Sequence, residues 1–346
     1  MSVMDEIGFG LIGCGRIARR HVEALEHLPG ARVAAVTDPV KEAAADLAGM
    51  CGAALVPDAE KLVAYPGVDA VIVASPSGLH AEQAVMAARA GRHVLVEKPL
   101  ALDAEQASRM IAEAEKAGVT LGVVHPLRFL PLARRLKEII AAGKLGRISH
   151  AAVTVRWNRN AEYYRSSPWR GTRAMDGGML LNQAVHHIDL LCWYLGDVAR
   201  VSAEVARRCH DIETEDVAVL NIRFTDGALG LAEVTTNIYP QNLAEEVALF
   251  GERGTVVLGG RRINELRTWR VAGEPPEEEV MREFAALSPR EPWRGHYDVL
   301  ADFCRALREG KEPEISGRLA WASLSVILAA YESATRGCAV EPQAMV

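Results

Sequence analysis

The first third of the chain alternates between two hydrophobic patterns. Short, unbroken apolar runs rich in Val and Ile are separated by longer segments whose apolar residues recur at helical spacing. This alternation is typical of parallel strands buried on both faces by helices, and it predicts a doubly wound sheet. We expect strands at residues 9–13, 31–38, 53–56, 69–75, 93–97 and 119–124, with helices at 16–28, 41–50, 79–90 and 104–117.

The pattern changes after about residue 125. Several later strands alternate apolar and polar residues, as half-exposed strands do, and Gly-containing turns separate them. This predicts an α+β domain with a large, mostly antiparallel open sheet, so the expected domains are residues 1–125 and 126–346. The strands are expected at 147–157, 199–207, 216–224, 228–236, 245–251 and 254–260, the helices at 131–142, 178–195, 297–309 and 319–333, and a solvated loop at 273–280.

Composition narrows the classes of partner. The 346 residues carry a formal net charge of -6, which argues against nucleic acid or a membrane surface as a general partner. The six cysteines contain no CxxC pair, so we expect reduced thiols and a cytoplasmic protein without a metal site. The N-terminus lacks the pattern of a signal peptide, and no apolar run approaches the roughly 20 residues of a membrane span.

A glycine motif connects the first strand to the first helix. Gly13 permits a tight turn, Gly15 lets a pyrophosphate approach the backbone, and Ala18 is small enough for the helix to pack closely. The helix N-terminus, with Arg16 and Ile17 in its first turn, offers free N–H groups to the anion. The motif in this context predicts a Rossmann domain that binds a dinucleotide.

Asp38 ends the second strand, 23 residues after Gly15. A carboxylate at this point binds the ribose hydroxyls of the adenosine and repels a 2′-phosphate, which favours NAD over NADP. Lys41 leaves NADP possible. The alternative is that Asp38 caps the next helix, which has Pro39 at its start.

The fourth and fifth strands end at the crevice where doubly wound sheets bind ligands. Ser75 and Ser77 are therefore candidate cofactor contacts, and His80 either joins them or packs in the first turn of its helix. The fifth strand ends in Glu97-Lys98-Pro99. A lysine there can hydrogen-bond a reacting hydroxyl and stabilise alkoxide charge, while Glu97 orients it or contacts ribose. The alternative is a charged turn without chemistry.

The motifs "GLIGCGRIA", "VTDP", "ASPSGLH", "HVLVEKPLA" and "RFLP", in this order, resemble those of the Gfo/Idh/MocA oxidoreductases. The resemblance spans the whole chain. It implies that Lys98 contacts the substrate and that Pro99 follows a cis bond. It also implies an α/β C-terminal domain whose open sheet forms the interface of a homo-oligomer, either a dimer or a tetramer.

The expected helix at 178–195 carries Asn182, His186 and Asp189 at spacings that place them on one face. From the residues alone, a core histidine bonded to Asp189 is favoured over a proton acceptor. The resemblance implies that His186 is the general base and that Asn182 binds substrate. Many sugar and inositol dehydrogenases of that family have Asp where this chain has Asn182. The amide cannot act as a base, which argues against a simple inositol dehydrogenase.

Residues 156–172 contain four arginines and four aromatic residues. Aromatic rings suit a sugar face and arginines suit carboxylate or phosphate, so Arg159, Tyr163 and Arg170 are candidate substrate ligands. Trp169 and Arg128 are candidate cofactor contacts. The alternative is a loop that covers an interface. The "NQ..H" form with "YYRSSPWRGT" upstream is similar to family members that oxidise the 3-hydroxyl of nucleotide-linked N-acetylhexosaminuronic acids.

These features predict an NAD-dependent dehydrogenase acting between its two domains on a secondary hydroxyl of a cyclic polyol, sugar or sugar acid. Lys98 polarises the oxygen, His186 accepts the proton, and the nicotinamide accepts hydride. Two alternatives remain open at this point. One is a glycosidase that uses NAD for transient oxidation. The other is a non-catalytic dinucleotide sensor, against which the presence of Lys98 and His186 argues.

Overall fold

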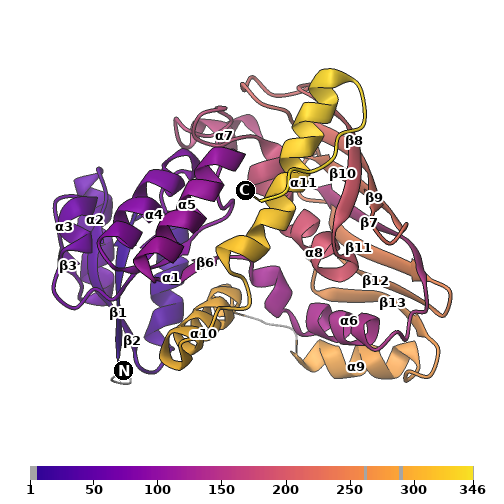
Figure 1. Cartoon of the computed structure of the whole chain (residues 1–346), viewed down its shortest axis with the longest axis horizontal. Helices are drawn as coiled ribbons and strands as arrows, with labels where there is room; N and C mark the ends of the chain where they lie inside the picture. Colours follow the sequence, from indigo (N-terminus) through magenta and orange to yellow (C-terminus); the bar gives the residue numbers. More distant parts are fainter. Residues whose placement is uncertain (1–5, 261–262, 288–290, 346) are drawn as a thin grey trace. The chain divides into compact units, whose positions relative to one another are not determined.

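The computed structural model describes residues 6–260, 263–287 and 291–345. These residues form two compact units (Figure 1). The N-terminal unit contains residues 6–126, 291–321 and 345, and the C-terminal unit contains 127–260, 263–287 and 322–344. Each unit has its own sheet, as the two hydrophobic patterns predict.

The N-terminal unit is built on a six-stranded parallel sheet of order β3-β2-β1-β4-β5-β6. The order reverses between β1 and β4, so the sheet has the switch point of a dinucleotide-binding fold. The predicted doubly wound sheet is thereby confirmed. The strands are β1 (Ile7–Ile12), β2 (Ala31–Thr37), β3 (Ala54–Leu55), β4 (Ala70–Val73), β5 (His93–Val96) and β6 (Leu121–Val123).

Helices connect these strands. Helix α1 packs on β2, and α4 packs on α5 and on strands β4 and β5, which leaves the central strands buried. The segments are α1 (Arg16–Glu26), α2 (Lys41–Cys51), α3 (Ala59–Val63), the 3-10 turn η1 (Ser77–Leu79), α4 (His80–Arg89) and α5 (Ala104–Ala117). A second 3-10 turn, η2 (Pro126–Phe129), follows the unit's last strand.

Helix α10 (Arg294–Glu309) corrects the predicted domain boundary, which placed all of residues 126–346 in the second domain. The helix returns to the N-terminal unit and packs against α1. The ring of Phe303 lies 6.5 Å from that of Phe9, and Gly122 leaves room for it because a Cβ there would approach Phe303 to 2.8 Å. Amphipathic spacing alone does not say which sheet a helix covers.

The C-terminal unit contains a seven-stranded sheet of order β13-β12-β11-β7-β10-β9-β8. All neighbours are antiparallel except β10 and β7, which run parallel, so the predicted mostly antiparallel sheet is confirmed. The strands are β7 (Ile148–Arg156), β8 (Val198–Ala206), β9 (Val217–Phe224), β10 (Leu229–Thr235), β11 (Ala244–Gly251), β12 (Gly254–Gly259) and β13 (Glu265–Val271).

Helices cover one face of this sheet, since α8 packs on β7, α6 on β12 and α9 on β13 (Figure 1). Along β9, alternate residues are exposed, so its other face is open. The helices are α6 (Pro131–Ala141), α7 (Ala161–Arg165), the π-helix η3 (Leu180–Ala184), α8 (Val185–Leu195), α9 (Glu277–Leu287) and α11 (Gly317–Arg336), the last of which begins in the N-terminal unit. No helix in the described part of the chain is long and apolar enough to cross a membrane.

The predicted loop at 273–280 is wrong in its second half. Helix α9 starts at Glu277, and its first turn contains Glu277, Glu278 and Glu279. Acidic residues stabilise the positive end of the helix dipole, so the charges that suggested a loop favour a helix N-terminus. The strand β13 was also missed, and it becomes an edge of the sheet by pairing with β12.

Candidate functional site

The glycine loop follows β1. Gly13 has φ of +95°, and a Cβ there would lie 2.7 Å from the backbone of Ala74, so only glycine fits without strain. Gly15 is the N-cap of α1 in extended conformation, and no side chain caps the helix. A Cβ at Gly15 would meet no atom within 4 Å. The open backbone and uncapped N–H groups fit a pyrophosphate, and buried Ala18 lets the helix pack closely.

Asp38 is half-buried beside this loop. Its Oδ2 accepts a hydrogen bond of 2.7 Å from the Cys14 backbone N–H, and its Oδ1 accepts one of 2.8 Å from Val40. Each oxygen retains a lone pair, so the carboxylate can still accept from a ribose hydroxyl. Helix α2 has Val40 as its N-cap, so Asp38 joins two loops rather than capping the helix directly.

The residues after β4 make different kinds of contact. The Ser75 hydroxyl donates to Gln83 Oε1 at 2.6 Å, and Ser77 is buried in η1. His80 is 1% exposed, with Nδ1 2.8 Å from the Pro99 carbonyl oxygen and Nε2 3.1 Å from that of Ser75. Burial lowers the pKa of His80, so the ring is neutral and donates from one nitrogen. These contacts support the packing alternative for His80.

The segment after β5 places a buried carboxylate next to the candidate catalytic lysine. Glu97 is 6% exposed, and its Oε1 lies 2.8 Å from Nε2 of His21 on α1. Its Oε2 accepts a 3.3 Å hydrogen bond from the backbone N–H of Lys98. The Lys98–Pro99 bond is cis, as the resemblance implies, and the Lys98 side chain is half-exposed. Glu97 therefore supports the turn from inside.

In the C-terminal unit, the predicted helix at 178–195 begins with the π-helix η3, a segment type that occurs often at functional sites. Asn182 lies within it and donates its side-chain amide to Asp176 Oδ1. The other oxygen, Asp176 Oδ2, accepts a 2.7 Å hydrogen bond from the Gly171 backbone. His186 is half-exposed one residue into α8, whereas its neighbour His187 is buried against Glu245 at 3.1 Å.

A buried carboxylate holds the start of the π-helix. Glu215 Oε1 accepts 2.8 Å from the Leu180 backbone N–H and 2.7 Å from the Tyr331 hydroxyl. Burial raises the pKa of Glu215. Gly178 permits this approach, because it has φ of +121° and a Cβ would lie 2.5 Å from the Tyr331 oxygen. Gly178 before the helix is thus a packing requirement.

The predicted polar stripe of Asn182, His186 and Asp189 is divided among different contacts. Asp189 accepts two hydrogen bonds from Arg128, of 2.7 Å from Nε and 2.6 Å from Nη2. Both side chains are almost fully buried, and the guanidinium also lies 5.5 Å from the Trp193 ring. Arg128 therefore supports α8 through Asp189, and its predicted contact with the cofactor stays a prediction.

The predicted arginine-rich segment forms a compact group, which we call the arginine cluster, namely Arg159, Tyr163, Trp169, Arg170 and Gln183. The Tyr163 hydroxyl accepts from Arg170 Nη1 at 2.6 Å, and both guanidinium groups lie over its ring, 5.1 Å away for Arg159 and 4.3 Å for Arg170. Arg170 also lies 4.6 Å from the Trp169 ring. The substrate candidates thus come together, and Trp169, a predicted cofactor contact, lies among them.

Sequence reasoning missed Gln183, which joins this cluster to the π-helix. Its Oε1 accepts from Arg159 Nη2 at 3.0 Å, and its Nε2 donates to the Tyr163 hydroxyl at 3.0 Å and to Asn182 Oδ1 at 3.3 Å. The only signal was its position beside Asn182. Sequence reasoning also missed His21, although helical spacing from Ala18 and Leu25 places it on the buried face of α1.

The arginine cluster has an excess of positive charge. Across residues 6–260, 263–287 and 291–345, no carboxylate lies within 4.0 Å of the guanidinium nitrogens of Arg159 or Arg170. The Nε atoms of both arginines are buried without a hydrogen-bond partner. Burial disfavours the charged form of Arg159 and thereby lowers its pKa. A bound anion would balance the charge of these two guanidinium groups.

The strand order, glycine loop and carboxylate after β2 define an oxidoreductase of the NAD-binding Rossmann class. A family model described as "Oxidoreductase family, NAD-binding Rossmann fold" matches residues 7–125, and one for the GFO/IDH/MocA C-terminal domain matches residues 133–257. The chain belongs to the Gfo/Idh/MocA oxidoreductase family and is an NAD-dependent enzyme.

Three relatives show the range of this family. The crystal structure of the WlbA dehydrogenase from Bordetella pertussis, in complex with NADH and UDP-GlcNAcA, is similar with a TM-score of 0.94 and 37% identity over 98% of each chain. The 1,5-anhydro-D-fructose reductase of Ensifer adhaerens is 30% identical over 96% of this chain and 98% of its own. Inositol 2-dehydrogenase 2 of Saccharopolyspora erythraea is 31% identical over 96% and 94%.

Proposed function

We propose that this enzyme oxidises a secondary hydroxyl of a nucleotide-linked N-acetylhexosaminuronic acid, with UDP-N-acetylglucosaminuronic acid as the first candidate and the 3-hydroxyl as the reacting group. The observation that carries the proposal is the arginine cluster. Its two arginines lack carboxylate partners, and its aromatic rings suit a sugar face. Inositol and other neutral polyols offer no anion for these guanidinium groups.

In this proposal, Lys98 hydrogen-bonds the reacting hydroxyl and stabilises the negative charge that develops on its oxygen. His186 accepts the hydroxyl proton, a role that its half-exposed position at the start of α8 allows. Bound NAD supplies the acceptor for the hydride that leaves the same carbon. Gly13, Gly15, Arg16, Ile17, Asp38, Ser75 and Ser77 remain the proposed cofactor residues.

The contacts of Asn182 support a role for this residue in substrate binding rather than in proton transfer. Its amide nitrogen donates to Asp176, so its Oδ1 is the oriented acceptor, and that atom already faces Gln183. A fixed acceptor next to Gln183, which itself bonds Arg159, suits the hydroxyl or acetamido N–H of a sugar acid. The similarity to the WlbA dehydrogenase, whose structure holds UDP-GlcNAcA, agrees with this choice.

The test is a substrate panel with NADH absorbance as the readout. The panel contains UDP-N-acetylglucosaminuronic acid, UDP-N-acetylglucosamine, UDP-glucuronic acid, free glucuronic acid and myo-inositol, each at saturating NAD. We expect the highest kcat/KM for the first compound, because it alone presents diphosphate, carboxylate and acetamido groups together. Equal or higher kcat/KM with myo-inositol would refute the proposal.

An aryl glycoside in the same panel tests the transient-oxidation alternative. Release of the phenol without net NADH would support the glycosidase, whereas the proposed dehydrogenase produces one NADH for each keto product. Purified protein should also be analysed for bound NADH, since a cofactor that stays bound between turnovers would hide net reduction. Adding a small keto acid as an external oxidant then distinguishes bound cofactor from inactivity.

We also propose that the enzyme is a homo-oligomer that forms through the open face of the C-terminal sheet. Val219, Leu229 and Leu231 expose 42%, 47% and 44% of their surface on neighbouring strands β9 and β10. Exposed apolar side chains on adjacent strands are typical of an interface. Sedimentation velocity of the wild type and of Leu231→Lys tests this. The six free cysteines support a cytoplasmic location.

A further inference from the structure

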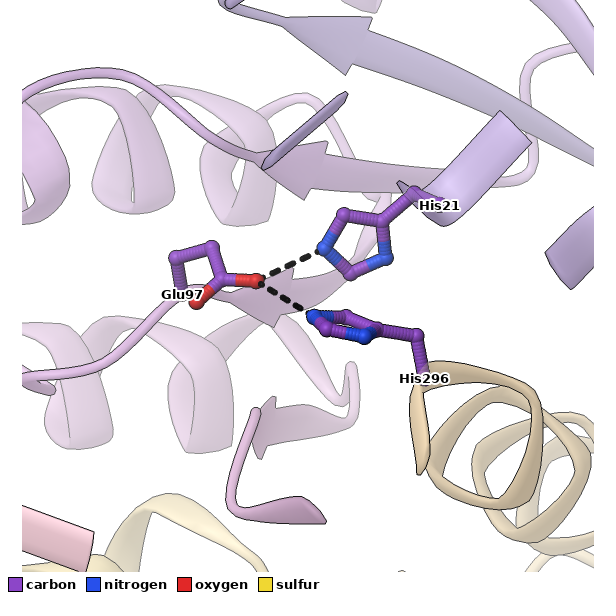
Figure 2. A group of neighbouring side chains, drawn as sticks. All are labelled: His21, Glu97 and His296. Carbon is purple, nitrogen blue, oxygen red and sulfur yellow. Dashed lines mark hydrogen bonds and ion pairs between the residues drawn. The ribbon is translucent and has the colours of Figure 1, made fainter. Parts of the chain in front are cut away.

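Three histidines surround the turn that carries Lys98; His21 and His80 are buried and His296 is partly buried. Figure 2 shows two of them, His21 from α1 and His296 from α10, with their rings facing the Glu97 carboxylate. The third is His80, whose Nδ1 contacts the Pro99 carbonyl oxygen. They come from three helices of the N-terminal unit, and the reaction proposed above uses none of them.

The contacts hold the residues on both sides of Lys98. Before the lysine, Glu97 Oε1 accepts from His21 at 2.8 Å and lies 3.7 Å from His296 Nε2, while Oε2 accepts the Lys98 backbone N–H. After the lysine, the shorter of the His80 contacts, at 2.8 Å, fixes the Pro99 carbonyl. The rings of His21 and His296 meet edge to face at 4.9 Å. The turn therefore has little freedom to move.

Two imidazoles and a carboxylate can also bind a metal ion, and their ligand atoms lie within 4.8 Å of one another. The protonation of His21 argues against this. Its Nδ1 is buried without a hydrogen-bond partner, and a metal on Nε2 would leave a proton on that unpartnered nitrogen. Metal-bound histidines normally donate from the second nitrogen. A proton on Nε2 instead satisfies Glu97 directly.

We infer that His21, His80 and His296 are positioning residues, which hold Glu97 and Pro99 so that the Lys98 ammonium keeps one orientation towards the reacting oxygen. We call this arrangement the histidine clamp. Burial lowers the pKa of His21, and its hydrogen bond holds the pKa of Glu97 well below its usual range, so a neutral ring donates to a charged carboxylate. The expected effect of the clamp on kcat rests on the proposed function, whereas its expected effect on the rigidity of the turn does not.

The experiment compares His296→Leu and His296→Gln with His27→Leu as the matched control. His296 is chosen because its side chain is 13% exposed and tolerates substitution better than the wholly buried His21. Glutamine retains an N–H donor near the position of Nε2, whereas leucine retains only volume. His27 is the exposed C-cap residue of α1 and stacks on Trp293, the N-cap residue of α10, at 4.2 Å. It contacts neither Glu97 nor Lys98, so His27→Leu controls for looser packing between α1 and α10.

The first readout is amide hydrogen exchange of the peptide spanning residues 94–101, which does not depend on activity. We expect roughly tenfold faster exchange in His296→Leu, a smaller change in His296→Gln, and none in His27→Leu. His80→Asn, which keeps a donor near Nδ1, provides a second variant if His296→Leu does not fold. Unchanged exchange in folded His296→Leu would refute the clamp.

The second readout is steady-state kinetics on the best substrate of the panel. A positioning role predicts that His296→Leu lowers kcat about tenfold with KM and NADH binding nearly unchanged, and that His296→Gln recovers part of the loss. If no substrate turns over, the exchange result still decides on the clamp. Stoichiometric zinc in the wild type, measured by mass spectrometry and lost in His296→Leu, would overturn the inference in favour of a metal site.

Discussion

The glycine loop of the N-terminal unit and the arginine cluster of the C-terminal unit both have hydrogen-bond donors that suit an anion, but they provide them by different means. The loop uses backbone N–H groups at an uncapped helix start, with glycine keeping the space open. The cluster uses long side chains whose positions depend on Tyr163 and Gln183. A backbone site needs a few small residues at fixed spacing, whereas a side-chain site needs partners from distant segments.

This contrast has a functional side. The loop lies in the part of the chain that matches the NAD-binding family model, and we expect it to tolerate little change because a Cβ at Gly13 would meet the backbone of Ala74. We expect substitutions of the arginines in the cluster to disturb the fold less, because Arg159 and Arg170 are partly exposed, whereas Gln183 is buried. We therefore expect variation in substrate preference to arise in the cluster and in residues near Asn182.

The largest effect should follow from Lys98→Met, which keeps the aliphatic stem and removes the ammonium. We expect kcat to fall by roughly a thousandfold, since stabilisation of developing charge is lost, while the dissociation constant for NADH changes little. Stopped-flow reduction of bound NAD and fluorescence titration with NADH measure the two quantities. A rate within threefold of the wild type, roughly 0.7 kcal/mol in the barrier, would eliminate the proposed mechanism.

The next largest effect concerns the arginine cluster. Arg170→Leu should raise KM for the nucleotide sugar acid by roughly 10- to 100-fold, because a charge-assisted hydrogen bond is lost, with kcat less affected. Arg165→Leu is the control, since Arg165 is exposed on the same segment. Similar kinetics for both variants would show that the cluster is a structural loop, which is the alternative that the sequence left open.

Two substitutions in the glycine loop distinguish an effect on folding stability from an effect on cofactor binding. Gly13→Ala places a Cβ against the backbone of Ala74 at positive φ, so we expect a loss of about 1–3 kcal/mol in the free energy of unfolding. Gly15→Ala meets no protein atom within 4 Å, so its stability should stay near that of the wild type while NAD binding weakens. Urea denaturation and NADH titration distinguish the two. Full NAD affinity in Gly15→Ala would place the pyrophosphate elsewhere.

The smallest effect is on the pH dependence of stability. Burial lowers the pKa of His21 and His80 in the native N-terminal unit below the ordinary value of 6.5. Unfolding therefore takes up protons as the pH falls below about 6.5, and the native state loses stability there. The lowered pKa of Glu97 adds a further loss below its ordinary value of 4.5.

Urea midpoints measured at pH 7.5 and 5.5 test this dependence. We expect a lower midpoint at the acidic pH, corresponding to about 1–2 kcal/mol, because two buried neutral rings must gain protons on unfolding. The variant His80→Asn should show a weaker dependence than the wild type, since one of the two titrating groups is gone. An equal or higher midpoint at pH 5.5 would contradict the assignment of neutral rings.

The sequence alone determined the six-stranded parallel sheet, the glycine loop and the acidic residue after β2. Each depends on local physics, because strand burial appears as unbroken apolar runs and a phosphate loop requires glycine at particular positions. The resemblance added the cis bond before Pro99. It also supplied the roles of Lys98 and His186, which stay predictions.

Tertiary structure decided the rest, because it depends on residues far apart in the chain. Helix α10 packs on the first sheet through Phe303, which no local pattern reveals. Asp189 pairs with Arg128 across 61 positions, a partner that spacing along its own helix does not show. His296 reaches Glu97 only because α10 returns to α1. Spacing along the sequence indicates which side chains are neighbours within one helix or strand. It does not indicate contacts between distant segments, which form only when the chain folds.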